Sequence, residues 1–205
     1  MAFKLLRKIT EMPWLEQGFP EGSEPTEANA PYTRKVALGI FLAVITSVFF
    51  LFVMAYLERM KLADWRPVDE PVLLWFNTLL LVVGSAAMQR ARKAEFGGRG
   101  SVSFALLLGG VMALAFLVGQ FIAWQSLSAG GYASVSNPAN AFFYLLTAIH
   151  GLHVAGGLFV WARAVWRSWR GAEAERIRLS VELCSVYWHY LLLVWLVLFA
   201  LMLAT

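Results

Sequence analysis

Residues 101–162, SVSFALLLGGVMALAFLVGQFIAWQSLSAGGYASVSNPANAFFYLLTAIHGLHVAGGLFVWA, contain no charged side chain. A helix that crosses the roughly 30 Å hydrocarbon core of a bilayer needs about 20 apolar residues, so this stretch is too long for one crossing. Its middle, residues 125–140, is polar and rich in Gly, Ser, Asn and Pro, a composition typical of a turn. The stretch therefore predicts two membrane-spanning helices joined by a short connection.

Three further apolar runs have the length of a membrane span. The composition agrees, because 60% of the side chains are hydrophobic and 15% are charged, whereas a soluble domain has about 25% charged residues. We predict an all-α, polytopic membrane protein with five transmembrane helices in one bundle, formed by residues 36–205 and preceded by a cytoplasmic N-terminal tail, residues 1–35. The predicted spans cover about residues 36–57, 71–88, 102–124, 139–161 and 182–204.

The basic residues indicate the orientation of these spans. The tail, the second connection and the fourth connection carry five, four and five Lys and Arg residues, whereas the first connection carries three and the remaining segments none. Cytoplasmic loops are the ones enriched in Lys and Arg, so we predict a cytoplasmic N-terminus and a C-terminus on the outer side. The basic residues lie in short blocks between apolar runs, so the net charge of +4 predicts no nucleic-acid partner. The single cysteine, Cys184, excludes an internal disulfide and a cysteine-based zinc site.

All three histidines, His150, His153 and His189, lie in apolar runs. Ionisable residues within a membrane usually face the bundle interior, a cavity or a partner. The predicted orientation places His153 and His189 about eight residues, or roughly 12 Å, from the inner boundary on neighbouring helices. His150 lies one turn from His153 on the same face, and Glu182 lies two turns below His189. We therefore predict a polar cluster of these four residues between the fourth and fifth spans.

Small and polar residues predict how the helices pack. Gly151, Ala155 and Gly156 lie near the histidines, and small residues about four apart allow another helix to approach closely. Asn77 and Gln120, together with two threonines, are expected to form hydrogen bonds between helices.

The histidines have three possible roles on this pattern. The first is structural, with neutral rings held by hydrogen bonds. The second is axial ligation of a b-type haem by His153 and His189, since bundles build cofactor sites from facing side chains. The third is a proton relay through Glu182, but the outer half of the bundle offers no ionisable group to continue it.

Several motifs together resemble subunit III of the haem-copper respiratory oxidases. They are HGLHVAGG in the fourth span, YWH followed by Trp195 in the fifth, WFNTLLLVVGSAA in the second, Gln120 with Trp124 in the third, NPANAFFYLLTAIHGLH, and Glu182 five residues before YWH. The resemblance covers about residues 36–203, and five spans match the shorter bacterial form of the family.

This resemblance implies a subunit that catalyses nothing alone and contains no haem, copper or other cofactor. Its implied partners are the catalytic subunit I, which with the other catalytic subunits holds the haem and copper, subunit II, and membrane lipids, including a bound phospholipid. The complex, in a bacterial cytoplasmic membrane, would pass electrons from cytochrome c or quinol to oxygen. The polar cluster would then be structural and lipid-associated.

The sequence departs from the family at three places where the family commonly has an intramembrane carboxylate. Apolar or hydroxyl residues stand near Ile45 and Thr46, and Ala123 and Leu192 replace the other two. A proton-handling role within the chain is therefore disfavoured. The alternatives that remain open are an accessory subunit of a nitric oxide reductase, a haem-binding membrane anchor and a small transporter.

Overall fold

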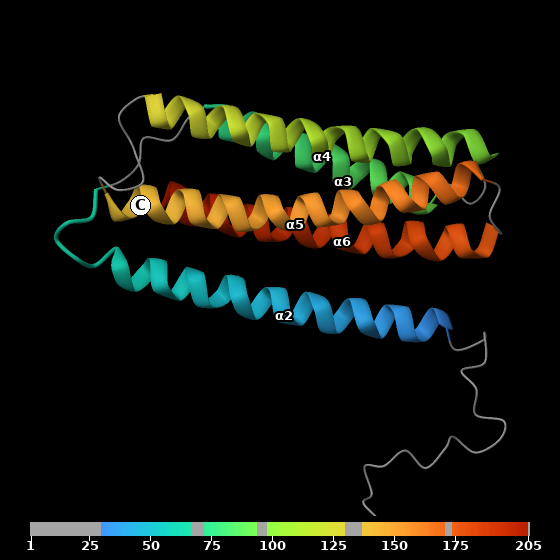
Figure 1. Ribbon diagram of the computed structural model, residues 1–205, viewed down its shortest axis with the longest axis horizontal. Coiled ribbons are helices and arrows are strands. Elements are labelled where there is room, and N and C mark those ends of the chain that lie inside the picture. The colour runs from blue at the N-terminus through green and yellow to red at the C-terminus, as the bar shows by residue number, and fades with distance from the viewer. Residues whose placement is uncertain (1–29, 67–71, 94–97, 130–136, 171–173, 205) are drawn as a thin grey trace, which may run out of the picture. The chain divides into compact units, whose positions relative to one another are not determined.

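The computed structural model of the protein describes residues 30–66, 72–93, 98–129, 137–170 and 174–204. These residues form five α-helices and, within the described ranges, no β-strand, so the predicted all-α class is confirmed. Figure 1 labels the helices α2 to α6: α2 (Ala30–Arg59), α3 (Leu73–Lys93), α4 (Gly98–Ala129), α5 (Pro138–Trp169) and α6 (Ala174–Leu203). Most of the predicted tail, residues 1–29, lies outside the described residues.

Each predicted span lies within one helix, apart from the first two residues of the second span and the last residue of the fifth. The helices are longer than the spans. Helices α2, α4, α5 and α6 have 30 to 32 residues, or about 45–48 Å at 1.5 Å per residue. The extra turns carry Arg, Ala and Glu, which have high helix propensity and continue a helix beyond the apolar region. The helices therefore continue beyond the predicted membrane spans at one or both ends.

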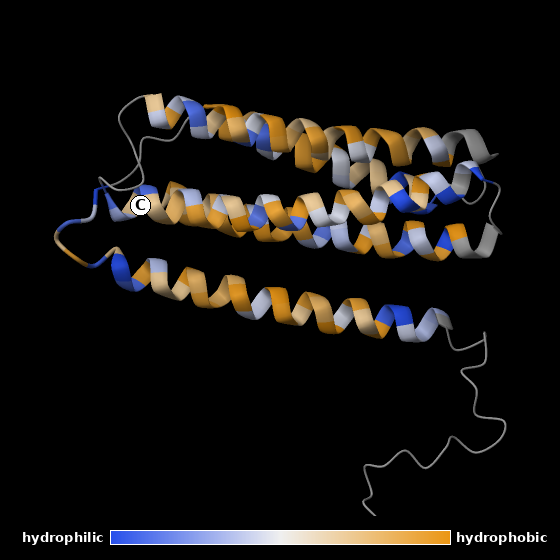
Figure 2. Ribbon diagram, viewed as in Figure 1, coloured by the Kyte–Doolittle hydropathy of each residue, from blue (hydrophilic) through white to orange (hydrophobic). Residues whose placement is uncertain are grey.

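Four of the helices are long and apolar enough to cross a membrane: α2 from Pro31, α4 from Val102, α5 to Arg167 and α6 from Ile177. Figure 2 shows that apolar residues dominate these helices and that hydrophilic residues gather near their ends. The predicted second span falls in α3, which has 21 residues and ends in Arg90, Arg92 and Lys93. The four spans establish a membrane protein.

Chain contacts divide the protein into Met1–Ala37 and Leu38–Thr205, and the helix packing described next lies within the second unit. Helix α3 packs against α4 and α6, and α5 packs against α4 and α6. We call these four helices the four-helix ring, because each contacts two others around a shared core. The largest fully buried side chains of the ring include Trp195, Phe116, Leu74, Met88 and Leu106.

Glycines allow the helices of the ring to approach closely. A Cβ atom added to Gly110 of α4 would lie 2.2 Å from the ring of Trp161 of α5, and one added to Gly157 of α5 would lie 2.6 Å from Tyr187 of α6. Real Cβ atoms do not come this close to a neighbour, so these positions accept only glycine unless the aromatic ring moves. In a membrane, such close backbone approach is a main source of helix association.

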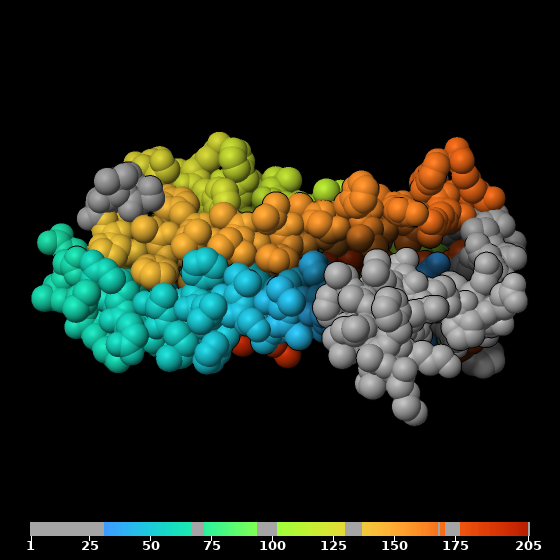
Figure 3. Space-filling view, turned by 60° about the horizontal axis from the view of Figure 1, so that its bottom comes forward, coloured from blue at the N-terminus to red at the C-terminus, as the bar shows by residue number. Residues whose placement is uncertain are grey.

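Residues 38–59 of α2 contact the four-helix ring through large side chains. Phe49 lies 5.5 Å from the ring of His153, and the Tyr56 ring lies 5.6 Å from that of Phe142 (centroid distances). Figure 3 shows the side chains of α2, in blue and cyan, along those of α5, in orange. In the apolar stretch of α2, 11% of the residues are buried, against 39% in α4 and α5 and 44% in α6. Helix α2 is therefore the most exposed of the four candidate spans.

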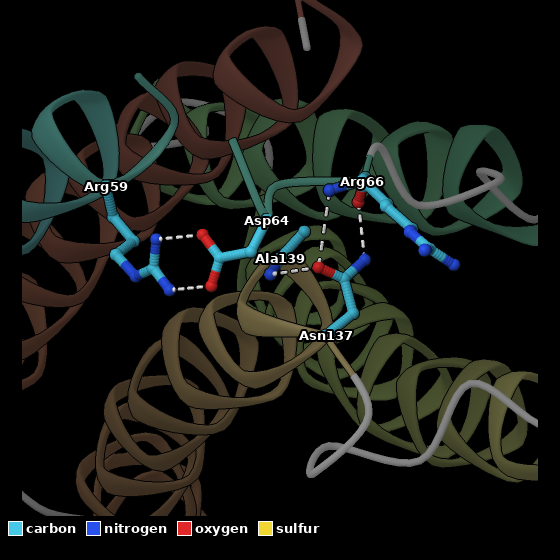
Figure 4. Close-up of polar contacts among 5 residues, drawn as sticks. All are labelled: Arg59, Asp64, Arg66, Asn137 and Ala139. Atoms are coloured by element: carbon cyan, nitrogen blue, oxygen red, sulfur yellow. Dashed lines mark hydrogen bonds and ion pairs between the residues drawn. The ribbon is translucent and has the colours of Figure 1, made fainter. Parts of the chain in front are cut away.

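The connection after α2 is held against the start of α5 (Figure 4). Arg59 Nη1 donates a hydrogen bond to Asp64 Oδ1 at 2.7 Å, and Asn137 Oδ1 accepts hydrogen bonds from the backbone N–H groups of Arg66 and Ala139. The bond to Ala139 caps the first turn of α5, where backbone N–H groups have no helical partner. The Arg59 guanidinium holds the pKa of the Asp64 carboxyl below its ordinary value.

Candidate functional site

Several hydrogen bonds join neighbouring helices of the four-helix ring, and three of them connect two side chains at 3.3 Å or less. Asn77 Nδ2 of α3 donates to Gln120 Oε1 of α4 at 3.3 Å. Trp124 Nε1 of α4 donates to the hydroxyl of Thr147 of α5 at 2.9 Å. The third pair joins α3 and α6, where an indole N–H also donates to a threonine hydroxyl at 2.9 Å (Trp195 and Thr78). Each bond gives its donor an acceptor that hydrocarbon cannot supply, and it fixes the register between two helices. Asn77 Oδ1 and Gln120 Nε2 are buried without a partner among the described residues.

His150 of α5 is fully buried at the centre of the ring. Its ring centroid lies 5.3 Å from that of Trp195 and 5.6 Å from that of Phe116, the latter in an edge-on arrangement. Neither ring nitrogen has a hydrogen-bond partner among the described residues. The His150 imidazole therefore packs against the aromatic side chains of Phe116 and Trp195.

His153, one turn further along α5, is half-buried and faces α2. Its Nδ1 lies 2.8 Å from the carbonyl oxygen of Ile149, four residues earlier in the same helix. The backbone carbonyl of His153 accepts a hydrogen bond from the Tyr187 hydroxyl of α6 at 3.0 Å. The backbone of His153, rather than its ring, thus makes the hydrogen bond between α5 and α6.

His189 of α6 is exposed. Its Nδ1 lies 2.6 Å from the carbonyl oxygen of Ser185, again within the same helix. Glu182 is half-buried two turns earlier, and its Oε1 lies 3.8 Å from Nη2 of Arg92 at the end of α3. The four residues of the predicted polar cluster therefore occupy different surroundings: the ring interior, the boundary with α2, the exposed face of α6 and an ion pair with α3.

The predicted packing residues also differ in their surroundings, because some are buried within this chain and others are exposed. Asn77 and Gln120 are buried and bonded to each other. A Cβ atom added to Gly151 would lie 3.6 Å from Leu117, which is an ordinary contact. Ala155 and Gly156 are exposed, and a Cβ atom added to Gly156 would meet nothing within 4 Å. Their packing role stays a prediction for contact with a partner chain. The close approach within this chain falls one residue further on, at Gly157.

A groove of about 200 Å³ lies between α2 and α6. Its wall has one polar spot, where the hydroxyls of Thr46 and Tyr190 lie 2.9 Å apart. The Thr46 hydroxyl also donates to the carbonyl oxygen of Leu42 at 2.8 Å. The Tyr190 hydroxyl can donate to Thr46 or, at 3.4 Å, to the same carbonyl oxygen of Leu42. Both hydroxyl protons therefore have acceptors within the wall of the groove. The apolar lining comprises Phe49, Phe50, Val53, Leu193, Val194, Val197 and Leu198.

Sequence reasoning missed the aromatic donors that connect the helices. Trp161 Nε1, for example, donates to the carbonyl oxygen of Leu106 in α4 at 2.8 Å. The signal was available, because an indole N–H in a membrane needs an acceptor. It also missed Gly110 and Gly119, each of which faces a bulky or polar side chain of another helix. Within the described ranges, no three or more His, Cys, Asp or Glu side chains are grouped to share a metal.

Comparisons with known proteins identify the family. The profile of the family described as cytochrome c oxidase subunit III matches residues 3–204. The chain is similar to cytochrome c oxidase subunit 3 of Synechocystis sp., with 29% identity over 188 residues that cover 86% of this chain and 79% of that protein. It is 30% identical to the protein of the same name from Thermostichus vulcanus, over 84% of this chain and 87% of that protein. A probable cytochrome c oxidase subunit 3 of Mycobacterium leprae is 32% identical over 73% of this chain and 76% of that protein. The match over nearly the whole chain, on a bundle of apolar helices, shows that this protein belongs to the cytochrome c oxidase subunit III family.

Proposed function

We propose that this chain is the non-catalytic accessory subunit of a respiratory haem-copper oxidase in a bacterial cytoplasmic membrane. Membership of the family makes it a subunit of an oxidase complex. The proposal adds that the haem and copper lie in the catalytic subunits, that this chain holds no cofactor of its own, and that it packs against subunit I beside subunit II. The observation that carries the proposal is the family match over residues 3–204.

The proposed topology has five crossings, with the N-terminus in the cytoplasm and the C-terminus outside. Helix α3 is the fifth crossing, although it is the least apolar. Its 21 residues correspond to about 31 Å, which matches the hydrocarbon thickness. Its polar residues Asn77 and Ser85 are buried inside the ring rather than exposed to lipid.

The four-helix ring is proposed to give the catalytic subunit a rigid neighbour. Its helices are locked by glycine contacts and by the three polar pairs, which leave little freedom for sliding or rotation. The exposed apolar faces of α2 to α6 are then available to lipid and to partner subunits.

The groove between α2 and α6 is proposed to hold a lipid acyl chain. Its apolar lining and committed hydroxyl protons favour a hydrocarbon chain over a ligand that needs a hydrogen-bond donor. Replacing Val194 by Trp should fill the groove and reduce the phospholipid that remains with the purified chain. The matched control, Leu152→Trp, changes an exposed residue of α5 outside the groove lining. Equal lipid content in both variants would refute the assignment.

Two alternatives remain as outcomes of the test. A nitric oxide reductase partner is favoured by the apolar residues Ala123 and Leu192, which stand where the oxidase family commonly has carboxylates. A haem anchor would require His153 and His189 to face one cofactor. In the structure, His153 faces α2 and His189 is exposed on α6, which supports the structural role.

The test is to tag the C-terminus, extract native membranes in mild detergent, and analyse the purified material by mass spectrometry and optical spectroscopy. We expect a large haem-copper subunit to accompany the chain, and its identity separates an oxidase from a nitric oxide reductase. Recovery of the chain alone and without colour would refute the proposal. Recovery alone with a haem spectrum would establish the anchor instead.

A further inference from the structure

His189 lies in the middle of the candidate span Ile177–Leu203, on the exposed side of α6. At 1.5 Å per residue it is about 18 Å from Ile177 and about 21 Å from Leu203. Its exposed neighbours on this side of the helix are apolar: Val186 and Leu196, with Leu193 and Val197 at the edge that this face shares with the groove between α2 and α6. A single imidazole is therefore presented outward at the depth of the hydrocarbon core.

The tautomer of this ring follows from the hydrogen bond that it makes within the described part of the chain. Nδ1 lies 2.6 Å from the carbonyl oxygen of Ser185. A carbonyl oxygen can only accept, so Nδ1 carries the proton and is the donor. In the neutral imidazole, Nε2 is then an acceptor with a free lone pair. The backbone of α6 thus fixes which nitrogen remains available on the exposed face.

Hydrocarbon offers no donor to that nitrogen. A polar group left without a partner in an apolar medium costs free energy, and ionisable side chains within spans almost always face a bundle interior, a cavity or another polar group. His153 shows the arrangement that this chain uses elsewhere. Its Nδ1 is bonded in the same way, but its ring is half-buried against Phe49 of α2. His189 lacks such cover among the described residues.

We propose that the face of α6 around His189 is the docking surface for a transmembrane helix of another oxidase subunit, which donates a hydrogen bond to His189 Nε2. The donor is a side-chain hydroxyl, indole or amide N–H at the depth of His189. This inference rests on the proposed function, because it requires that the chain works beside another membrane subunit. It adds the face, the atom and the chemistry of the contact.

The first test uses the tagged full-length chain, expressed in its native membrane with His189→Phe or His189→Gln. Phenylalanine keeps the ring but removes the acceptor, whereas the glutamine amide oxygen reaches about as far as Nε2 and restores one. We expect His189→Phe to lower the amount of co-purified catalytic subunit about threefold, in keeping with one interhelical hydrogen bond in a membrane, and His189→Gln to retain most of it. Equal co-purification by wild type and His189→Phe would overturn the inference.

The second test does not depend on the stability of these variants. A photo-reactive benzoylphenylalanine at position 189, irradiated in native membranes, should form a cross-link to a larger polypeptide that mass spectrometry identifies as another oxidase subunit. A cross-link to lipid, to a second copy of this chain or to its own N-terminal tail would overturn the docking surface. The wild-type chain separates the two failures: if it brings down no oxidase subunit, the proposed function itself is wrong.

Discussion

Helix α2 and helix α6 are alike in sequence character and different in packing. Both have 30 residues and are strongly apolar. Yet 44% of the apolar stretch of α6 is buried, whereas in α2 the fraction is 11%. The difference comes from what each helix meets. Tyr187 of α6 lies on Gly157 of α5, while the single glycine of α2, Gly39, has nothing within 4 Å of an added Cβ.

The comparison shows that apolar composition does not decide how a membrane helix packs. Lipid is as apolar as a leucine side chain, so helices associate through close backbone contact and polar pairs rather than through hydrophobicity. The four-helix ring has both features, and α2 reaches it mainly through aromatic rings and one hydroxyl pair. We therefore expect substitutions in the ring to cost more stability than similar substitutions in α2.

The largest effect is expected at Gly110. Leucine at this position would collide with Trp161, whose indole is held by its hydrogen bond to Leu106. We expect Gly110→Leu to lower the free energy of unfolding of the detergent-solubilised chain by about 3 kcal/mol, the upper part of the range for overpacking. Gly39→Leu in α2 is the matched control and should change it by less than about 0.5 kcal/mol. Equal losses of unfolding free energy in Gly110→Leu and Gly39→Leu would contradict the expected difference between the four-helix ring and α2.

A smaller effect is expected for the buried pair Asn77–Gln120. Asn77→Ala leaves the Gln120 carbonyl oxygen without its donor inside the ring, a loss of about 1–3 kcal/mol. The double variant Asn77→Ala/Gln120→Ala should cost less than the sum of the two single variants, because the pair is lost only once. Strict additivity in a denaturation series would mean that the two amides do not interact.

The contact of α2 with α6 at Thr46 and Tyr190 should be weaker still. Removing it by Thr46→Val is expected to cost about 0.6 kcal/mol, which is typical of an interhelical hydrogen bond in a membrane protein. Tyr190→Phe should add little once Thr46 is replaced. If Thr46→Val lost as much unfolding free energy as Asn77→Ala, the contacts of α2 would stabilise the protein as much as those within the four-helix ring.

The smallest effect concerns the connection after α2 and depends on pH. Arg59 holds the pKa of Asp64 below its ordinary value of 3.8, so the pair stabilises the fold fully above pH 3.8 and loses this contribution as the pH falls through the lower folded pKa. The difference in unfolding free energy between wild type and Asp64→Asn should be constant from pH 7 to about pH 5. It should shrink below 3.8. A difference that grows in acid would contradict the assignment.

The fold was predictable from sequence because hydropathy and charge locate apolar helices directly. The division between two helices falls inside the predicted connection 125–140, although α4 continues to Ala129 and α5 begins at Pro138, capped by Asn137. The positions of single side chains around each helix were not predictable in the same way. His153 and His189 were placed at one depth, but depth does not fix which face a ring occupies, and the ring of His189 is exposed on α6. A shift of one residue, from Gly156 to Gly157, likewise moves a glycine by 100° around the helix and into the contact.

The most direct test of the accessory role is to follow haem and oxygen consumption when this chain is separated from its complex. The complex is purified through a tag on this chain, dissociated in stronger detergent, and both fractions are examined by optical spectroscopy and oxygen uptake. We expect the haem bands and the oxygen consumption to stay with the other subunits, and the separated chain to be colourless. A haem band that travels with this chain, or oxygen consumption by the chain alone, would contradict the account.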